Sequence, residues 1–529
     1  MKSKHKKIPA SGIAGLTAYW KSDLVSGFLV FLLALPLSLG IAKASGFPAA
    51  MGVLTAMIGG LFVSFFKVSP LTIKGPAAGL ITVSAASIAA MGGGDMGWHA
   101  TGAIIVTMAF FQLVFAWLKF GSFSDFFPHS AVHGMLAAVG LIIIAKQIPV
   151  LLGDDPIIYK GEGPIELFMD IPRFIHEAHW HIAFIGIISL IILFGLPMLK
   201  IDLLKRVPAP MIVLILAVPL AVSMHFRETE PGYSLVNVGN FWDNVKIQPD
   251  FSGIFTFPYW KYVIMFLFVN SLESLLTVKA VDNLDPYKRE SDYNDDLKAL
   301  GAGNALSGLL GGLPMISEVV RSSANINFGA RTKWSNFFHG VFLLLAMLLM
   351  IPLIEMIPNT ALAAMLIYAG YRLAAPREFF NTYQIGKEQL AIFITTILVT
   401  LFEDLLLGVA AGILVKILFH LYNGAPLNSL FKGIYSVEKT ETTTTIHVNG
   451  SAVFSNLLGY KKVLLHLPEK EKVIMDFSKT RLIDHSFMHF IHHFEHEYNN
   501  RGGEFKIAGL KKHKCLSDHP LATRKLKKA

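Results

Sequence analysis

The 529-residue sequence is poor in two kinds of residue, cysteine and charged residues. Its one cysteine, Cys515, cannot form a disulfide within the chain, so the cysteine content says nothing about the redox compartment. Charged residues make up 16% of the chain, whereas a soluble globular protein has about a quarter. The deficit falls in the first 420 residues or so, which excludes a wholly soluble protein.

Long apolar runs are abundant instead, and each approaches the roughly 20 residues that a helix needs to cross the hydrocarbon core. They cover residues 25–42, 49–66, 104–120, 131–152, 182–199, 211–224, 262–278, 341–357, 390–401 and 408–421. The first run follows a basic head, residues 1–7, and no small-residue cleavage site follows it. It is also too long for the core of a signal peptide. The sequence therefore predicts a polytopic α-helical membrane protein with a retained first span.

The charges between the runs predict the orientation, because Lys and Arg accumulate in cytoplasmic loops. Residues 153–173 carry five acidic and two basic residues, and we expect them to be external. Residues 200–206, 331–333 and 372–387 are basic and should be internal. An even number of spans then puts both termini in the cytoplasm. We expect the protein to lie in the inner membrane of a bacterium. The same rule explains the net charge of +9, so no nucleic-acid partner is expected.

Composition changes after about residue 421, where polar and charged residues dominate. Strand-like and helix-like segments alternate as β-α-β-α-β in fewer than about 100 residues, which indicates a small α/β domain. We expect a cytoplasmic N-terminal segment at 1–22, a transmembrane transport domain at 23–425 and a cytoplasmic α/β domain at 426–510. The tail, 511–529, contains seven Lys or Arg and is expected to be loosely ordered near anionic lipid headgroups.

Two apolar segments, one in each half of the membrane region, are interrupted by glycine and proline. Residues 70–91 open with a Gly-Pro pair, and residues 301–330 contain the run Gly-Gly-Leu-Pro. A matched pair of broken segments predicts an inverted-repeat transporter with a site at the midplane. We expect 75–91 and 315–330 to form short helices whose N-termini face each other, because converging N–H groups bind an anion. Tight packing of small residues is the alternative, but it does not explain the prolines.

Three ionisable residues stand out at membrane depth. Glu273 is a lone acid in an apolar run, and Glu318 and Arg321 follow the second break. Such groups cost about 3 kcal/mol or more each, so they are functional by default. An ion pair between Glu318 and Arg321, three residues apart, is the structural alternative.

Several motifs resemble the SulP sulfate-permease family of anion transporters. They are residues 23–46 (DLVSGFLVFLLALPLSLGIAKASG), the Gly-Pro break at 75–76, residues 271–283 (SLESLLTVKAVDN), and residues 303–336, which run from GNALSGLLGG to GARTKWSN. The C-terminal domain resembles the STAS domain that ends these proteins. The resemblance implies about fourteen membrane segments as two inverted repeats of seven, divided into core and gate domains. It also implies a homodimer and membrane lipids as partners.

The resemblance places an anion site between the facing ends of the third and tenth segments, with contributions from the first and eighth. The substrate-binding residues carried over are Ser38, Ile41, Gly75, Pro76, Ala77, Ala78, Gly79, Ser317, Glu318, Val319, Val320 and Arg321. The cation-coupling residues are Glu273, Thr277 and Glu318. In bicarbonate-transporting members, a carboxylate and a hydroxyl at the positions of Glu273 and Thr277 help to hold sodium. In other members, a glutamate there is associated with protons.

Three positions depart from the family's pattern. Ala77 stands where Thr is frequent, Val320 where Ser is frequent, and Leu37 where Gln is frequent. Their absence leaves backbone N–H groups and Arg321 to do most of the anion binding. Glu318 adds a second carboxylate where small residues are common. Because two like charges close together in a low dielectric repel, a proton or cation must accompany the anion.

The sequence thus predicts a secondary active transporter of small inorganic anions, of the sulfate or bicarbonate class, and not an enzyme. Symport coupled to H⁺ or Na⁺ by alternating access is favoured, with no other cofactor. An anion exchanger or channel is the alternative, and it would need no titrating acid.

A third class of function is a membrane-tethered metal-binding regulator or enzyme. Its signal is a set of histidines at i,i+4 spacings that zinc could use, namely His485, His489, His492, His493 and His496. Solvated histidines on a helix surface are the more common explanation, so no metal is assigned. Ser486 corresponds to the serine that is phosphorylated in small STAS proteins, which makes it a regulatory candidate. The STAS domain could also hold a cytoplasmic partner.

Overall fold

The computed structural model describes residues 8–121, 127–155, 159, 162–198, 208–239, 241–287, 289–403, 405–440, 443–468, 471–500 and 502–527. The predictions for the basic head, 1–7, and for the internal loop at 200–206 lie outside these residues. Contacts divide the chain into two compact units, residues 1–121 with 139–373, and residues 122–138 with 374–529. Each unit is described by itself.

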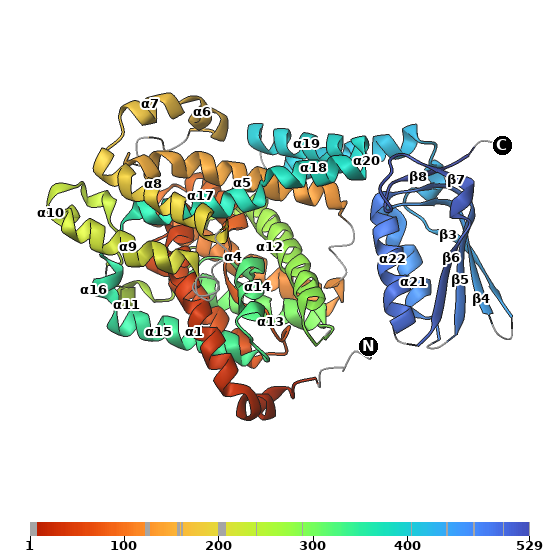
Figure 1. Cartoon of the computed structure of the whole chain (residues 1–529), viewed down its shortest axis with the longest axis horizontal. Coiled ribbons are helices and arrows are strands. Elements are labelled where there is room, and N and C mark those ends of the chain that lie inside the picture. The colour runs from red at the N-terminus through yellow and green to blue at the C-terminus, as the bar shows by residue number, and fades with distance from the viewer. Residues whose placement is uncertain are drawn as a thin grey trace. The chain divides into compact units, whose positions relative to one another are not determined.

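The first unit is helical (Figure 1). Its α-helices are α1 (Gly12–Ala44), α2 (Ala49–Leu61), α3 (Ile81–Ala90), α4 (Gly94–Trp117), α6 (Pro164–Met169), α7 (Ile171–His176), α8 (Trp180–Gly195), α9 (Ala209–Ser223), α10 (Phe226–Thr229), α11 (Phe241–Asn244), α12 (Phe257–Leu284), α13 (Tyr293–Leu309), α14 (Val319–Asn327), α15 (Trp334–Leu349), α16 (Ile351–Ile354) and α17 (Asn359–Leu373). Helix α5 (His129–Leu152) begins in the second unit and continues into the first. Short 3-10 turns are η1 (Val63–Phe65), η2 (Ala78–Leu80), η4 (Leu196–Met198), η6 (Gly232–Ser234) and η7 (Ser252–Phe255).

Six helices among the described residues are long and apolar enough to cross a membrane. They are Gly12–Ala44, Gly94–Trp117, His129–Leu152, Trp180–Met198, Phe257–Asp282 and Leu405–Tyr422. Four shorter apolar helices accompany them, Ala49–Phe65, Ala78–Ala90, Ala209–Ser223 and Trp334–Leu349. The helical membrane architecture is confirmed, and the count of fourteen segments stays a prediction.

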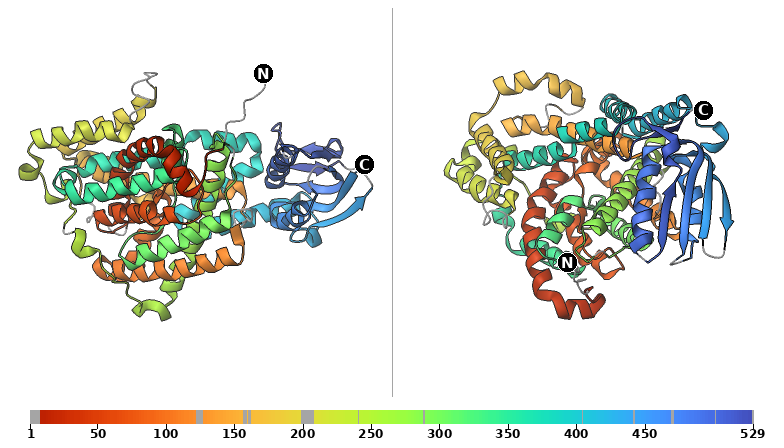
Figure 2. Two further views of the ribbon diagram at one scale, coloured as in Figure 1. Left: turned by 90° about the horizontal axis from the view of Figure 1, so that it is seen from below. Right: turned by 45° about the vertical axis from the view of Figure 1, so that its right-hand side comes forward.

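Small residues allow the helices of this unit to approach closely. A Cβ added to Gly60 of α2 would lie 2.6 Å from the Cα of Gly340 on α15, so only glycine permits this crossing. Close backbone approach is the usual basis of helix association in lipid, because burial of apolar surface does not drive association there. Figure 2 shows the orange α4 running beside the green α12 and α13, which it contacts. This packing places the two broken segments inside the unit.

The second unit combines three helices with the α/β domain. The helices are α18 (Pro376–Ile385), α19 (Lys387–Phe402) and α20 (Leu405–Tyr422). The domain contains β3 (Ile434–Lys439), β4 (Thr443–Ala452), α21 (Leu457–Leu465), β5 (Lys472–Ile483), α22 (His485–Asn500), β6 (Glu504–Ala508), β7 (His513–Cys515) and β8 (Arg524–Leu526), with 3-10 turns η8 (Leu427–Ser429), η9 (Phe454–Asn456) and η10 (Leu510–Lys512).

The sheet confirms the predicted β-α-β-α-β order. Strand β4 pairs parallel with β5, and β5 pairs parallel with β6, while β3 pairs antiparallel with β4. Both parallel connections pass through a helix, and Figure 1 shows α21 and α22 covering the same face of the sheet. Side chains such as Ile446, Val473 and Phe487 fill the core between the helices and the sheet. Along residues 443–448, half-buried and buried side chains alternate, as expected for a strand with one face on this core.

The tail differs from the expectation of a separate, loosely ordered segment. Residues 513–515 and 524–526 form β7 and β8, and β8 pairs with the end of β5 at Leu482 and Ile483. Strand β5 has 12 residues, and β6 covers only its first part, so an open edge remains for β8. The seven positive charges of the tail predicted a loosely ordered segment and gave no sign of this strand pairing. The pairing forms all the same, because backbone hydrogen bonds in an edge strand do not depend on side-chain polarity.

Candidate functional site

Two short strands, β1 (Lys74–Pro76) and β2 (Met315–Ser317), bring the two broken segments together. They pair antiparallel, with Gly75 opposite Ile316. Helix α3 follows β1 after the turn η2, and α14 follows β2 directly. Because antiparallel strands leave their pairing at opposite ends, the two helices begin at the strand pair and run away from it. The predicted pair of short half-helices with facing N-termini is confirmed.

Buried amide side chains satisfy the backbone of this broken region. The N–H of Met315 donates to Oδ1 of Asn304 at 2.7 Å, and its carbonyl accepts from Nδ2 of Asn270 at 2.7 Å. On the other strand, the N–H of Lys74 donates to Oδ1 of Asn336 at 3.2 Å. Non-helical backbone at membrane depth is tolerated only where protein groups pair with it, and these asparagines do so.

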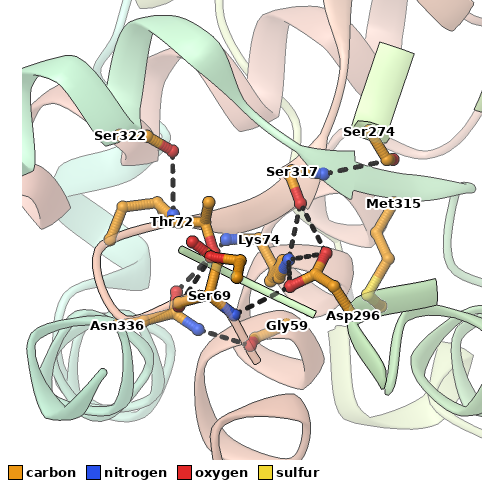
Figure 3. Close-up of polar contacts among 12 residues, drawn as sticks. Gly59, Ser69, Thr72, Lys74, Ser274, Asp296, Met315, Ser317, Ser322 and Asn336 are labelled. Atoms are coloured by element: carbon orange, nitrogen blue, oxygen red, sulfur yellow. Dashed lines mark hydrogen bonds and ion pairs between the residues drawn. The ribbon is translucent and has the colours of Figure 1, made fainter. Parts of the chain in front are cut away.

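A buried ion pair joins the two strands to α13 (Figure 3). Nζ of Lys74 lies 2.8 and 2.6 Å from the carboxylate oxygens of Asp296 and donates to the hydroxyl of Ser317 at 2.5 Å. The Lys74 and Asp296 side chains are 0% and 2% exposed. Ser317 was predicted to bind the anion, and the structure shows its side chain held by Lys74 and Asp296.

The sequence analysis passed over this pair. The available signal was a lysine inside a segment of small apolar residues, which is as unusual at membrane depth as Glu273. Asp296 gave no signal, because it stands in the acidic start of α13, beside Asp292 and Asp295.

Arg321 is completely buried and lies in the first turn of α14. Its nearest acid is Glu318, with Nε 3.7 Å from Oε2, which is a loose ion pair. All three of its side-chain nitrogens lack a hydrogen-bond partner among the described residues. A Cβ added to Gly75 would lie 2.6 Å from Nη1, so the guanidinium lies directly against the backbone of the first break. Its donors are available to an anion at the facing helix ends.

The two predicted carboxylates lie beside the N-terminus of α3. The backbone N–H of Ala78 donates to the Glu318 carboxylate. The Glu273 carboxylate is so close to the Cα of Gly79 that any Cβ there would collide with it. Oε1 of Glu273 has no hydrogen-bond partner among the described residues, and each carboxylate is within electrostatic reach of the other. The structure therefore brings Glu273, Glu318 and Arg321 into one buried site.

The remaining predicted residues come from elements that contact these half-helices. Helix α1 carries Ser38 and Ile41, helix α12 carries Thr277 four residues after Glu273, and both helices contact α3 and α14. Ser38 is buried, and its hydroxyl has no hydrogen-bond partner in the described part of the chain. The stretch from Gly75 to Gly79 (Gly75, Pro76, Ala77, Ala78 and Gly79) and residues Val319 and Val320 line the two helix starts, where they offer backbone groups. Val319 is 42% exposed.

His339 is a site residue that the sequence analysis missed. It lies on α15, is completely buried, and neither ring nitrogen has a hydrogen-bond partner among the described residues. The charge of Arg321 is within electrostatic reach of it, which makes it a buried polar neighbour of the site. A lone histidine in an apolar helix is normally part of a core, which is why its sequence context gave no signal.

In the second unit, Ser486 lies in a buried ion-pair network rather than on the surface. Nζ of Lys416, on α20, lies 3.0 Å from Oδ2 of Asp484 and donates to the hydroxyl of Ser486 at 2.8 Å. Nε2 of His420 lies 3.3 Å from the same Asp484 oxygen. Burial raises the pKa of Asp484, but Lys416 and His420 outweigh it and hold the pKa well below its ordinary value. Ser486 is 5% exposed, so phosphorylation would first have to release it.

The histidines of α22 make other contacts in the described part of the chain. Within the described ranges, no three His, Cys, Asp or Glu residues are arranged to hold a metal ion. His485 donates from Nδ1 to the Leu521 carbonyl at 2.9 Å, and His489 stacks at 4.7 Å against His129. The described residues therefore give the metal-binding alternative no cluster of ligands.

Known proteins resemble this chain over most of its length. Residues 20–396 match the sulfate permease family. The chain is 23% identical to sulfate transporter 4.1, chloroplastic, of Arabidopsis thaliana, over 93% of this chain and 76% of that protein. It is 24% identical to the bicarbonate transporter BicA of Picosynechococcus sp. (strain ATCC 27264 / PCC 7002 / PR-6), over 75% of this chain and 69% of that protein. A solved structure of the murine Solute Carrier 26 family member A9 anion transporter, in the inward-facing state, has a TM-score of 0.65 at 15% identity and covers 95% of this chain and 90% of that chain.

The fold is a helical membrane domain with paired half-helices, followed by a C-terminal α/β domain. Because the matched region exceeds half of the chain, the protein belongs to the sulfate permease family. Its C-terminal domain follows the transmembrane domain as a STAS domain does, and the chain is a transporter rather than an enzyme.

Proposed function

We propose that this protein is a secondary active transporter of small inorganic anions, of the sulfate or bicarbonate class, working by alternating access as an H⁺- or Na⁺-coupled symporter. One observation carries the proposal. A buried guanidinium with available donors, Arg321, lies beside two buried carboxylates at the facing N-termini of α3 and α14.

Charge counting explains the coupling. With Glu273 and Glu318 both ionised, the three side chains sum to one negative charge, which repels an anion. Protonating one acid, or binding Na⁺ next to it, makes the sum zero, and neutralising both leaves the single positive charge of Arg321. The helix N-termini add partial positive charge at the same place. An anion is therefore bound most strongly when a cation has entered with it, which is the requirement for symport.

A channel or an exchanger fits this site less well. Neither needs an acid that changes its charge during the cycle, and burying two carboxylates beside an anion pathway would only weaken anion binding. Sulfate and bicarbonate are the substrates that the names of the relatives give, and the site discriminates poorly between them because Ala77 and Val320 supply no hydroxyl.

The direct test is uptake of labelled sulfate and bicarbonate by proteoliposomes under an imposed proton gradient or sodium gradient. We predict that wild-type protein accumulates one of these anions against its gradient only when one cation gradient is present. Glu273→Gln should abolish this accumulation because the amide keeps the shape of the side chain but cannot change its charge.

Glu228→Gln is the matched control, because Glu228 is an exposed acid on α10 outside the site. It should leave uptake unchanged. Flux by the wild type that ignores both pH and sodium would favour a channel or exchanger, and concentrative uptake by Glu273→Gln would remove Glu273 from the mechanism.

We also propose that the protein is a homodimer in a bacterial inner membrane, with both termini in the cytoplasm. The acidic segment 153–173, which should face outward, supports this orientation. Protease added to intact spheroplasts should spare the STAS domain and cleave it only after lysis; cleavage from outside would reverse the orientation. The mass of the protein in detergent, measured by light scattering, tests the dimer.

A further inference from the structure

A cavity of about 560 Å³ lies in the first unit, away from the candidate anion site. Its walls come from the ends of α1 and α3, from α5 and α17, and from the segment after α5. Its polar side chains are those of Lys43, Lys146, Gln147, Tyr159, Glu162 and Asn359. None of the predicted anion-site residues lines it.

The cavity lies beyond the anion site along two helices. Lys43 follows Ser38 by five residues on α1, or about 7.5 Å at 1.5 Å per residue. On α3, Ala85 of the cavity wall follows Gly79 by six residues, about 9 Å. Because Glu162 also lines the cavity, this end is the one that we propose to be external. The cavity is therefore about one and a half helical turns outward of the anion site along these two helices.

Two lysine ammonium groups dominate the charge of the cavity. Lys146, on α5, is half-buried, and no charged group in the described part of the chain acts on it. Lys43 is also half-buried; its Nζ lies 3.4 Å from the carbonyl of Tyr233, and Asp155 is its one acidic neighbour. A lysine without a counter-charge at membrane depth is costly, and an anion beside it would supply the missing charge.

The volume indicates what kind of anion fits. At about 30 Å³ per water molecule, the cavity has room for on the order of twenty waters. An oxyanion can therefore enter with most of its hydration water, whereas the close contacts around Gly75 and Gly79 leave the inner site little space. Entry of the hydrated anion and its dehydration at the inner site would then be two separate steps. Each would have a smaller free-energy cost than the two combined.

We infer that this cavity is an outer collecting site, in which Lys43 and Lys146 hold a hydrated inorganic oxyanion before it passes to Arg321. This inference rests on the proposed transport function, and it adds a second binding site and its ligand class. The two ammonium groups outnumber the one carboxylate of the cavity wall, Glu162, and a net positive charge raises the local concentration of an anion. The site should therefore affect the apparent affinity for external anion more than the maximal rate.

Binding is tested without transport by lysine labelling. Purified full-length protein in nanodiscs is treated with a membrane-impermeant sulfonated N-hydroxysuccinimide acetate, and acetylation is followed by mass spectrometry in sulfate, bicarbonate or gluconate at equal ionic strength. We expect sulfate or bicarbonate to slow labelling of Lys43 and Lys146 at least threefold. Labelling of Lys246, an exposed lysine before α12, should not change.

A lipid phosphate is the other source of the same chemistry, and the labelling experiment separates the two. If Lys146 is already protected in nanodiscs without added anion and becomes reactive in lipid-free detergent, a lipid headgroup occupies the cavity and the collecting role is wrong. Labelling that no anion slows, in nanodiscs or detergent, would mean that both lysines merely extend toward the interface, and would also overturn the inference.

Transport kinetics give the second readout. Lys146→Gln and Lys43→Gln should raise the apparent KM for external anion about tenfold with a nearly unchanged maximal rate. Lys246→Gln removes one charge from the segment between α9 and α12 and should change neither value. Unchanged KM in both cavity variants, with normal wild-type transport, would refute the outer site and leave the proposed function standing. If the anions protect the lysines but the wild-type protein transports none of them, the proposed transport function is wrong and the outer binding site stands.

Discussion

Removal of Lys74 is the sharpest test of how the broken segments are held together. The Asp296 carboxylate accepts two bonds from Lys74 at 2.8 and 2.6 Å, one from the N–H of Ser69 at 3.0 Å and one from the hydroxyl of Ser317 at 3.3 Å. Lys74→Met removes two of these four bonds and the only positive charge at the pair. At about 1.5–3 kcal/mol for each hydrogen bond to a charged group, the loss is about 3–6 kcal/mol. This agrees with the roughly 3–5 kcal/mol that follows from breaking a buried ion pair.

The free energy of unfolding would be measured by titrating sodium dodecyl sulfate into mixed micelles. Lys74→Met should lower it by about 3–5 kcal/mol, and Lys74→Met combined with Asp296→Asn should recover most of the loss, because no charge is then left unpaired. Lys67→Met is the matched control. Its Nζ lies 2.6 Å from Asp295, but the lysine side chain is 78% exposed, so no measurable change is expected. A loss below about 1 kcal/mol in Lys74→Met, or no recovery in the double variant, would refute the structural role of the pair.

Two further predictions concern the anion site and the α/β domain. Arg321→Gln should weaken the apparent affinity for anion by about 1–3 kcal/mol and change cation dependence little; if combining it with Glu318→Gln restores the affinity in uptake assays, Arg321 is structural and the backbone N–H groups bind the anion alone. Burial lowers the pKa of His485 to about 4, whereas the pKa of a histidine in the unfolded chain is about 6.5. Between these two pH values the unfolded chain therefore binds one more proton than the folded domain. As the pH falls from about 6.5 to about 4, the free energy of unfolding should therefore decrease by about 1.4 kcal/mol per pH unit, about 3 kcal/mol in total. His485→Asn should flatten this slope in denaturant titrations of the full chain. An unchanged slope would show that another group titrates.

Local sequence patterns were sufficient for much of the fold. The Gly-Pro break and the Gly-Gly-Leu-Pro run marked both short half-helices, because adjacent glycine and proline residues disfavour a continuous helix, whereas a lone proline such as Pro36 stays inside α1. Glu273 was identifiable because one acid in an apolar span is anomalous by itself. The alternating pattern of residues 443–448 and the apolar stripe of α22 likewise depend only on neighbours in the chain.

The assembled site required tertiary information. Strand β1 pairs with β2 across about 240 residues of sequence, and no local pattern encodes that register. Lys74 could be recognised as unusual, but its partner Asp296 could not, because an aspartate at the start of a helix is ordinary. Ser317 illustrates the same limit, since only packing decided that its hydroxyl accepts a hydrogen bond from Lys74.

The sequence by itself determined that this chain crosses the membrane, that two of its membrane segments are broken and where, and that an α/β domain follows. These properties depend on hydropathy, backbone chemistry and periodicity, which act over a few residues. Only the tertiary structure decided that Arg321 lies against Gly75, that Lys43 and Lys146 share a cavity, and that the basic tail completes a sheet. Those contacts join residues far apart in the chain, and their energies depend on distance and burial that no single segment specifies.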